Sequence, residues 1–119
     1  MNFIEIIVDG KGSARAEIDG RNPRTAAEIM ERLPQEARAQ LWGEEVYFSL
    51  PFSLADENPS PSSEAGDVSF WTPGSAFCIF FGRTQPYSAV NTIGRIVSGI
   101  DVFPRVEEGD RIVLRQAEA

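Results

Sequence analysis

The segment GSAFCIFFGRTQPYSAVNTIGRIVSGIDVF, residues 74–103, contains two clear strand signals joined by a loop. The runs AFCIFF (76–81) and VNTIGRIV (90–97) are short, apolar and bounded by turn residues. Because successive side chains of a strand point to opposite faces, the first run has two distinct sides. The side that we expect to face the protein interior carries Phe77, Ile79 and Phe81. The side that we expect to face outward, toward any groove, carries Ala76, Cys78 and Phe80.

Working outward from this segment, the rest of the chain adds further strands. The expected strands are 3–8, 13–18, 44–50, 67–71 and 110–115, with a possible short strand at 52–54. Asp9-Gly10 between the first two indicates a hairpin turn, because both residues tolerate positive φ. The seven or eight strands make this a mainly β chain.

One main α-helix is expected after these first two strands. Asn22 is a good N-cap, Pro23 suits the first helical position, and apolar residues at helical spacing continue until Pro34. A second helical turn is expected over 35–41. The pattern predicts a closed or nearly closed β-barrel with the helix capping one open end, in a single domain spanning residues 1–119.

Composition narrows the classes of function. The 119 residues carry a net charge of −7, so the basic surface required by nucleic acids is missing and we expect no nucleic-acid partner. No run approaches the ~20 apolar residues of a membrane helix, and the first ten residues do not resemble a signal peptide. We therefore expect a cytoplasmic protein without a membrane partner. Residues 55–66, rich in proline, serine and acidic residues, are expected to form a flexible surface loop.

The chain contains no histidine and a single cysteine, Cys78. A Ser-His-Asp triad, a Cys-His pair and an intramolecular disulfide are therefore ruled out. The usual zinc ligand sets cannot be assembled, and the acidic residues lack the spacing of a calcium loop. We expect no metal site and no cofactor.

Residues 74–103 resemble the part of the cyclophilin sequence in which Ser-Gln-Phe-Phe is followed, after a variable loop, by Phe-Gly-Lys-Val and a glycine-led turn. Here the corresponding runs are SAFC (75–78), IGRI (93–96) and the turn at Gly99. A closer resemblance, to a small prokaryotic family of cyclophilin-like proteins, spans nearly the whole chain. It rests on WGEEVYFS (42–49), GDVSFWTPGSAFCIFFG (66–82) and AVNTIGRIVSG (89–99). This resemblance implies a compact cyclophilin-type barrel, in a family described without an established activity.

Cyclophilins are peptidyl-prolyl isomerases, and the resemblance implies positions for their arginine, glutamine, phenylalanine floor and loop histidine. The corresponding early strand, 44–50, has no arginine, and Ala76 stands at the glutamine position. Cys78 replaces a phenylalanine of the floor, and the histidine position falls near Val90 or Asn91. The usual isomerase residues are therefore missing. An arginine from a neighbouring segment, Arg83 or Arg95, would be needed for a weak or divergent isomerase.

We expect instead that the outward groove binds a small molecule or short peptide. Alternation places Glu45, Tyr47 and Ser49 on the outward side of strand 44–50, and Glu45 would favour a cationic or hydrogen-bond-donating group. The full set of candidate binding residues is Glu45, Tyr47, Ser49, Trp71, Ala76, Cys78, Phe80, Tyr87 and Asn91. Two alternatives stay open, a divergent isomerase and a protein-interaction or subunit module, and the sequence does not fix the oligomeric state.

Overall fold

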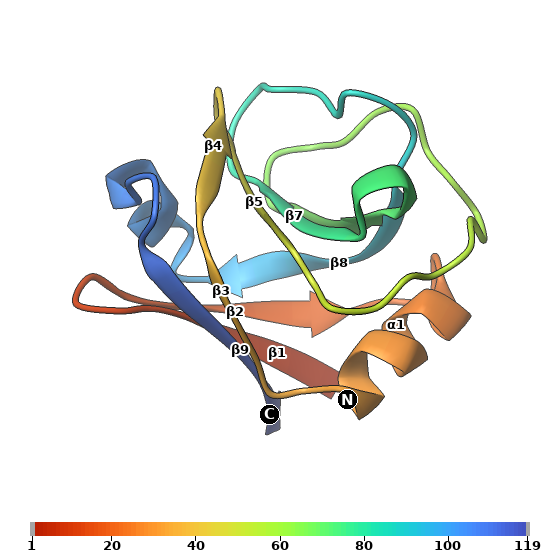
Figure 1. The fold of residues 1–119 in the computed structure, drawn as a ribbon, viewed down its shortest axis with the longest axis horizontal. Coiled ribbons are helices and arrows are strands. Elements are labelled where there is room, and N and C mark those ends of the chain that lie inside the picture. Colours follow the sequence, from red (N-terminus) through yellow and green to blue (C-terminus); the bar gives the residue numbers. More distant parts are fainter. Residues whose placement is uncertain (1, 119) are drawn as a thin grey trace.

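The computed structural model describes residues 2–118, which form nine β-strands and one α-helix (Figure 1). The elements are β1 (Asn2–Val8), β2 (Gly12–Ile18), α1 (Pro23–Glu31), β3 (Gln35–Arg38), β4 (Gln40–Trp42), β5 (Glu45–Ser49), β6 (Asp67–Trp71), β7 (Ala76–Phe80), β8 (Asn91–Ser98) and β9 (Arg111–Glu118). Two short 3-10 turns, η1 (Thr72–Gly74) and η2 (Ile100–Arg105), follow β6 and β8. No helix in this described part of the chain is long and apolar enough to cross a membrane.

The strands form one antiparallel sheet in the order β3-β9-β1-β2-β8-β6-β7-β5-β4. The two edge strands, β3 and β4, are consecutive in the chain and separated only by Ala39 (Figure 1). The Ala39 N–H donates to the carbonyl oxygen of Asp110, and its carbonyl oxygen accepts from the Gly109 N–H, both at 2.8 Å. The chain therefore links both edges of the sheet, which gives the nearly closed barrel that the sequence predicts.

The prediction of a second helical turn at 35–41 is wrong, because this segment forms β3 and β4. Gln35 of β3 lies opposite Leu114 of β9, and Leu41 of β4 lies opposite Val46 of β5. Hydrogen bonding of β3 to the remote β9 and of β4 to the adjoining β5 outweighs the small helix preference of a short local sequence.

The possible strand at 52–54 does not form either. β5 is already paired with β4 on one side and with β7 on the other, so it offers no free edge to this segment. Phe52 instead packs on the core and stacks its ring on Phe70, with ring centroids 6.2 Å apart.

The inward face of β7 contributes to the barrel core. Phe77 and Ile79 are fully buried there, as the alternation predicts, and the Phe77 ring stacks on Phe48 of β5 at 5.6 Å. From α1, which packs beside β8, Ala26 and Ile29 enter the same core. Burying an apolar side chain of this size stabilises a fold by about 1.5–3 kcal/mol. These contacts make the sheet a rigid support for its outer surface.

Two glycines of β8 and its following turn are required by the close approach of β2. A Cβ atom at Gly94 would collide with the carbonyl oxygen of Glu17. Gly99 has a φ of +81°, and a Cβ there would collide with the carbonyl oxygen of Ser13. A side chain at either position would push β8 away from β2.

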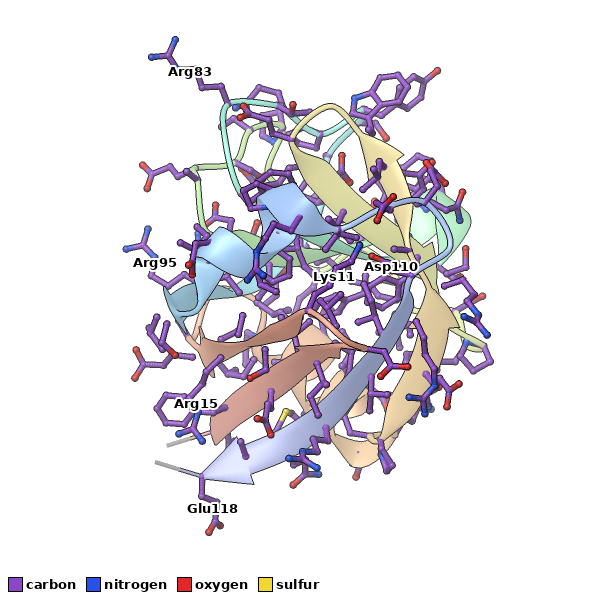
Figure 2. The ribbon with its side chains drawn as sticks, turned by 90° about the vertical axis from the view of Figure 1, so that its left-hand side faces the viewer. Lys11, Arg15, Arg83, Arg95, Asp110 and Glu118 are labelled. Atoms are coloured by element: carbon purple, nitrogen blue, oxygen red, sulfur yellow. The ribbon has the colours of Figure 1, made fainter. Side chains whose placement is uncertain are left out.

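Charged side chains join the surface elements. Lys11, the single lysine, donates to Asp110 at 2.6 Å and Glu107 at 2.8 Å, which ties the β1–β2 turn to the start of β9 (Figure 2). Arg83 and Arg95 instead project from the surface in this view. Arg95 pairs with Glu64 at 3.3 Å.

The irregular segment 55–66 is held against the barrel at several points. The backbones of Ser60 and Val90 exchange hydrogen bonds of 2.8 and 2.9 Å. The Asn58 N–H donates to the Asn22 side-chain oxygen at 2.6 Å. Because these contacts tie the segment to α1 and β8, we expect residues 57–60 to be less mobile than their composition indicates.

Candidate ligand-binding pocket

A hollow of about 210 Å³ lies on the outer face of the sheet formed by β5, β6 and β7. It is built from four parts of the chain: the β4–β5 hairpin, the end of β6, the middle of β7 and the loop between β7 and β8. The residues that line it are Trp42, Glu45, Tyr47, Trp71, Cys78, Pro86, Tyr87 and Val90. We call this hollow the aromatic pocket.

The pairing of β5 and β7 sets the floor of the aromatic pocket. Tyr47 lies directly opposite Cys78, so their side chains share the outer face of the sheet. Beside Cys78 on the same face of β7, Ala76 and Phe80 complete a small apolar cluster separate from the barrel core, with Trp71 packed against it. The outward face of β7 is thus covered rather than solvent-exposed, since Cys78 is only 2% exposed.

Three large aromatic rings form the walls. The Tyr87 ring centroid lies 6.2 Å from that of Trp42 and 6.1 Å from that of Trp71, and it meets both at nearly right angles (85° and 87°). Trp71 is held in place because its indole N–H donates to Ser88 Oγ at 2.7 Å, and Gly74 packs directly against the indole ring. Trp42 and Tyr87 remain 51% and 79% exposed, which is unusual for rings of this size.

Glu45 is the one acidic residue among those that line the pocket, and it is only 7% exposed. No lysine or arginine within residues 2–118 forms an ion pair with it. Burial raises the pKa of the Glu45 carboxyl, and the neighbouring Cys78 thiol offsets only part of this effect. A carboxylate in these surroundings is poorly solvated and gains from any cation that enters.

The Cys78 thiol has the properties of a floor group rather than a nucleophile. Burial raises the pKa of Cys78 well above its ordinary value, and the nearby Glu45 carboxylate adds to the increase. The sulfur donates to the carbonyl oxygen of Ala76 at 3.7 Å. Because the thiolate is the reactive form, this cysteine is chemically quiet at neutral pH.

The structure brings five of the nine predicted site residues together in the lining: Glu45, Tyr47, Trp71, Cys78 and Tyr87. Ala76 and Phe80 lie in the apolar cluster that supports the floor. Ser49 is exposed outside the lining, where its hydroxyl donates to the carbonyl oxygen of Gly74 at 3.1 Å.

Asn91 also lies outside the lining, fully buried beside α1. Its side-chain nitrogen donates to Thr25 Oγ1 at 3.1 Å and to the carbonyl oxygen of Ala55 at 3.0 Å, and its oxygen accepts from the Glu57 N–H at 3.1 Å. All of its polar atoms are used to join α1, segment 55–66 and β8.

Sequence reasoning missed three lining residues, Trp42, Pro86 and Val90. Trp42 faces Glu45 across the β4–β5 hairpin, whose two-residue turn contains Gly43 at a φ of +59°. A glycine in a short turn before an alternating strand is a hairpin signal, and it could have identified Trp42. Pro86 lies within the loop before β8, and Val90 is the last residue of that loop. No periodic pattern in a loop indicates which side chains turn toward the pocket.

No arginine contributes to this lining. Arg83 projects outward from the loop after β7, and Arg95 pairs with Glu64 on another part of the surface (Figure 2). The arrangement therefore lacks a guanidinium group to stabilise a twisted prolyl amide.

Fold and pocket together define a small antiparallel β-barrel with an aromatic, acid-containing hollow on its outer surface. A family model described as cyclophilin-like matches residues 2–115, and the chain belongs to this cyclophilin-like family. A search of curated proteins found no match to the sequence.

Two solved structures share the fold. The solution structure of the hypothetical protein AF2241 from Archaeoglobus fulgidus is similar at 33% identity and a TM-score of 0.84, covering 97% of this chain and 94% of that one. The structure of McbB in complex with tryptophan is similar at 18% identity and a TM-score of 0.80, covering 98% of this chain. The chain spans 45% of the McbB chain, so the likeness concerns only part of that protein.

Proposed function

We propose that this protein binds a small organic molecule, or one side chain of a short peptide, in the aromatic pocket. The observation that carries the proposal is the position of Glu45, a residue that is only 7% exposed and lines an apolar hollow without an ion-pair partner among residues 2–118. A buried acid is ordinarily paired or hydrogen-bonded, because its desolvation is unfavourable. A ligand would supply the missing partner.

The exposed aromatic rings give independent support. Trp42 and Tyr87 are large, mostly apolar side chains that remain open to solvent around the hollow. Ligand sites are typically lined by aromatic residues with a few polar groups that fix orientation. The hollow of about 210 Å³ is smaller than the 300–1,000 Å³ of sites for drug-sized ligands, which favours a compact group.

The McbB comparison adds a parallel at the level of the fold. That protein was solved with tryptophan, so a barrel of this type can belong to a protein that binds a small amino-containing molecule. The comparison does not identify the ligand of this chain. AF2241 is described as hypothetical and supplies no activity to transfer.

Prolyl isomerisation receives no support from the pocket. Ala76 lies in the apolar cluster beside Cys78 and outside the lining, and the lining includes neither an arginine nor a residue able to replace the histidine. In a protease-coupled isomerisation assay we expect the rate to match the uncatalysed background. Clear catalysis would show that the alternative function, a divergent isomerase, is correct.

Nuclear magnetic resonance of the two tryptophans provides a direct test. The chain contains only Trp42 and Trp71, and both line the pocket, so each indole N–H signal reports on it. We expect members of a panel of amines, alcohols and dipeptides to shift both signals saturably. A panel that leaves both signals unchanged, or shifts only residues elsewhere on the barrel, would contradict the proposed function.

A further inference from the structure

We propose that the group recognised in the aromatic pocket is an alkylated ammonium ion, such as a trimethylammonium group. This inference rests on the proposed function and names the class of ligand for the same site. It follows from the combination of perpendicular aromatic walls, one buried carboxylate and a lining with few other polar groups.

The walls provide the first argument. Tyr87 lies at nearly right angles to both Trp42 and Trp71, with ring centroids 6.1–6.2 Å away. Tyr47 adds a fourth ring from the floor. Aromatic faces carry negative charge density and attract cations within about 6 Å, and grouped rings of this type recognise quaternary ammonium ions. A neutral ligand would gain only the apolar contact.

The charge distribution provides the second argument. The other titratable residues of the lining are Tyr47 from the same strand as Glu45, Cys78 from β7 and Tyr87 from the loop before β8. The adjacent Glu44 turns away, and its carboxylate accepts from the Arg83 N–H at 2.8 Å. The local field therefore favours a positive ligand, with no lysine or arginine of the lining to oppose it.

The mostly apolar lining favours an alkylated over a primary ammonium ion. A primary ammonium has three N–H donors and is strongly hydrated, so it needs several acceptors on entering a pocket. Here the lining offers one carboxylate and two phenol oxygens, and the Trp71 N–H is a donor already used by Ser88. A trimethylammonium group needs no acceptors and presents methyl groups to the rings. A guanidinium group brings five N–H donors in a fixed planar arrangement, more than the four oxygens that the carboxylate and the two phenols supply.

The test compares choline with 3,3-dimethyl-1-butanol, the neutral molecule in which carbon replaces nitrogen. Titrations followed by the Trp42 and Trp71 indole signals give a dissociation constant for each. We expect choline to bind at least tenfold more tightly than the alcohol. Glu45→Gln should remove most of that difference, whereas Glu44→Gln, which deletes the same charge one residue away, should retain it.

A pH series gives a second readout. Because a cation pairs with the ionised carboxylate, the affinity for choline should fall as pH is lowered through the pKa of Glu45. The affinity for the neutral alcohol should stay constant over the same range, and the Glu45→Gln variant should show no such dependence for either compound.

The outcomes separate this inference from the proposed function. If both compounds bind equally, or if Glu45→Gln leaves the preference for choline intact, the ammonium inference is wrong while ligand binding stands. If neither compound nor any member of the panel binds, both are wrong. A peptide containing trimethyllysine, measured beside choline and an unmodified peptide, shows whether the ammonium group comes from a protein or from a free metabolite. The inference is supported if choline binds more tightly than the neutral alcohol, or if the trimethyllysine peptide binds more tightly than the unmodified peptide.

Discussion

Two hollows on this barrel are lined in part by acidic residues, and Glu45 in one differs from Glu57 in the other in its hydrogen-bond partners. The aromatic pocket contains Glu45, whose surroundings are apolar rings and a thiol. The second hollow, of about 330 Å³, lies between α1 and segment 54–58 and contains Glu57. Its carboxylate accepts from the backbone N–H groups of Arg24 and Thr25 at 3.1 and 2.9 Å, and from Thr25 Oγ1 at 2.9 Å.

The two acids differ in pKa accordingly. Burial opposes ionisation of Glu57, yet the hydrogen bonds from Thr25 and Arg24 prevail and lower its pKa. Burial raises the pKa of Glu45 because no comparable set of donors surrounds it. Glu57 caps the first turn of α1 and so has its partners within the chain. The comparison contrasts an acid whose hydrogen-bond donors lie on the backbone and side chains of α1 with an acid whose one neighbouring donor is a thiol, and the second acid is the one that we propose to bind a ligand.

The largest effect is expected from replacing Asn91. Its side chain joins the elements around the second hollow, although the sequence placed it among the candidate binding residues. Asn91→Ala leaves the Ala55 carbonyl oxygen and the Glu57 N–H without their buried partner and removes one of the hydrogen bonds of Thr25 Oγ1, so we expect the free energy of unfolding to fall by about 2–3 kcal/mol. Chemical denaturation measures this change. Affinity for choline in the folded variant should stay within threefold of the original, and a large loss would place Asn91 in the binding site instead.

A smaller but clear contrast is expected between the two glutamates. Glu57→Ala removes the acceptor at the start of α1 and should lower the melting temperature by roughly 4 °C, as loss of a helix cap does. Glu45→Gln should leave the melting temperature unchanged or raise it, because it removes a poorly solvated charge. Thermal unfolding followed by circular dichroism compares them. Equal destabilisation by both substitutions would contradict the proposed difference between Glu57 and Glu45.

The pH dependence of stability should have opposite signs for the two acids. The pKa of Glu57 is lowered in the folded state, so its contribution is present above the ordinary value of 4.5 and is lost as pH falls through the folded pKa. The pKa of Glu45 is raised, so its contribution is present below 4.5 and is lost as pH rises through the folded pKa.

Denaturation of both glutamine variants between pH 3 and pH 8 tests this. Near neutral pH, Glu57→Gln should be less stable than the original protein and Glu45→Gln at least as stable, and both differences should shrink in acid. The same sign for both variants would contradict the account.

The smallest effect concerns the thiol in the floor of the aromatic pocket. Since Cys78 is buried and its pKa is raised, a thiol reagent at neutral pH should modify the folded protein far more slowly than the denatured protein. Rapid modification of the folded protein, measured by mass spectrometry, would mean that the floor is open.

Local patterns were sufficient to predict much of the fold and part of the site. The alternation in AFCIFF correctly separated Phe77 and Ile79 from Cys78, because a strand divides its side chains by sequence parity alone. The same rule brought Glu45 and Tyr47 to one face. Features that depend on remote partners could not be predicted in this way.

The segment 35–42 shows the limit most clearly. The extended conformation of its first part, β3, depends on β9, more than seventy residues later, and the local sequence of 35–41 was therefore misread as helical. Trp42 was missed with it. Asn91 lies at a position where the family resemblance indicated a site, but its hydrogen-bond partners on α1 and segment 55–57 became visible only in three dimensions.

The most direct test is a carbon-13 titration of the Glu45 side-chain carboxyl, without and with saturating choline, using Glu45→Gln to assign the signal. We expect a pKa above the ordinary 4.5 in the free protein and a lower pKa when choline is bound, because the cation stabilises the ionised carboxylate. A pKa at or below 4.5 in the free protein, or one that choline leaves unchanged, would contradict the claim that Glu45 is an unpaired acid awaiting a cationic ligand.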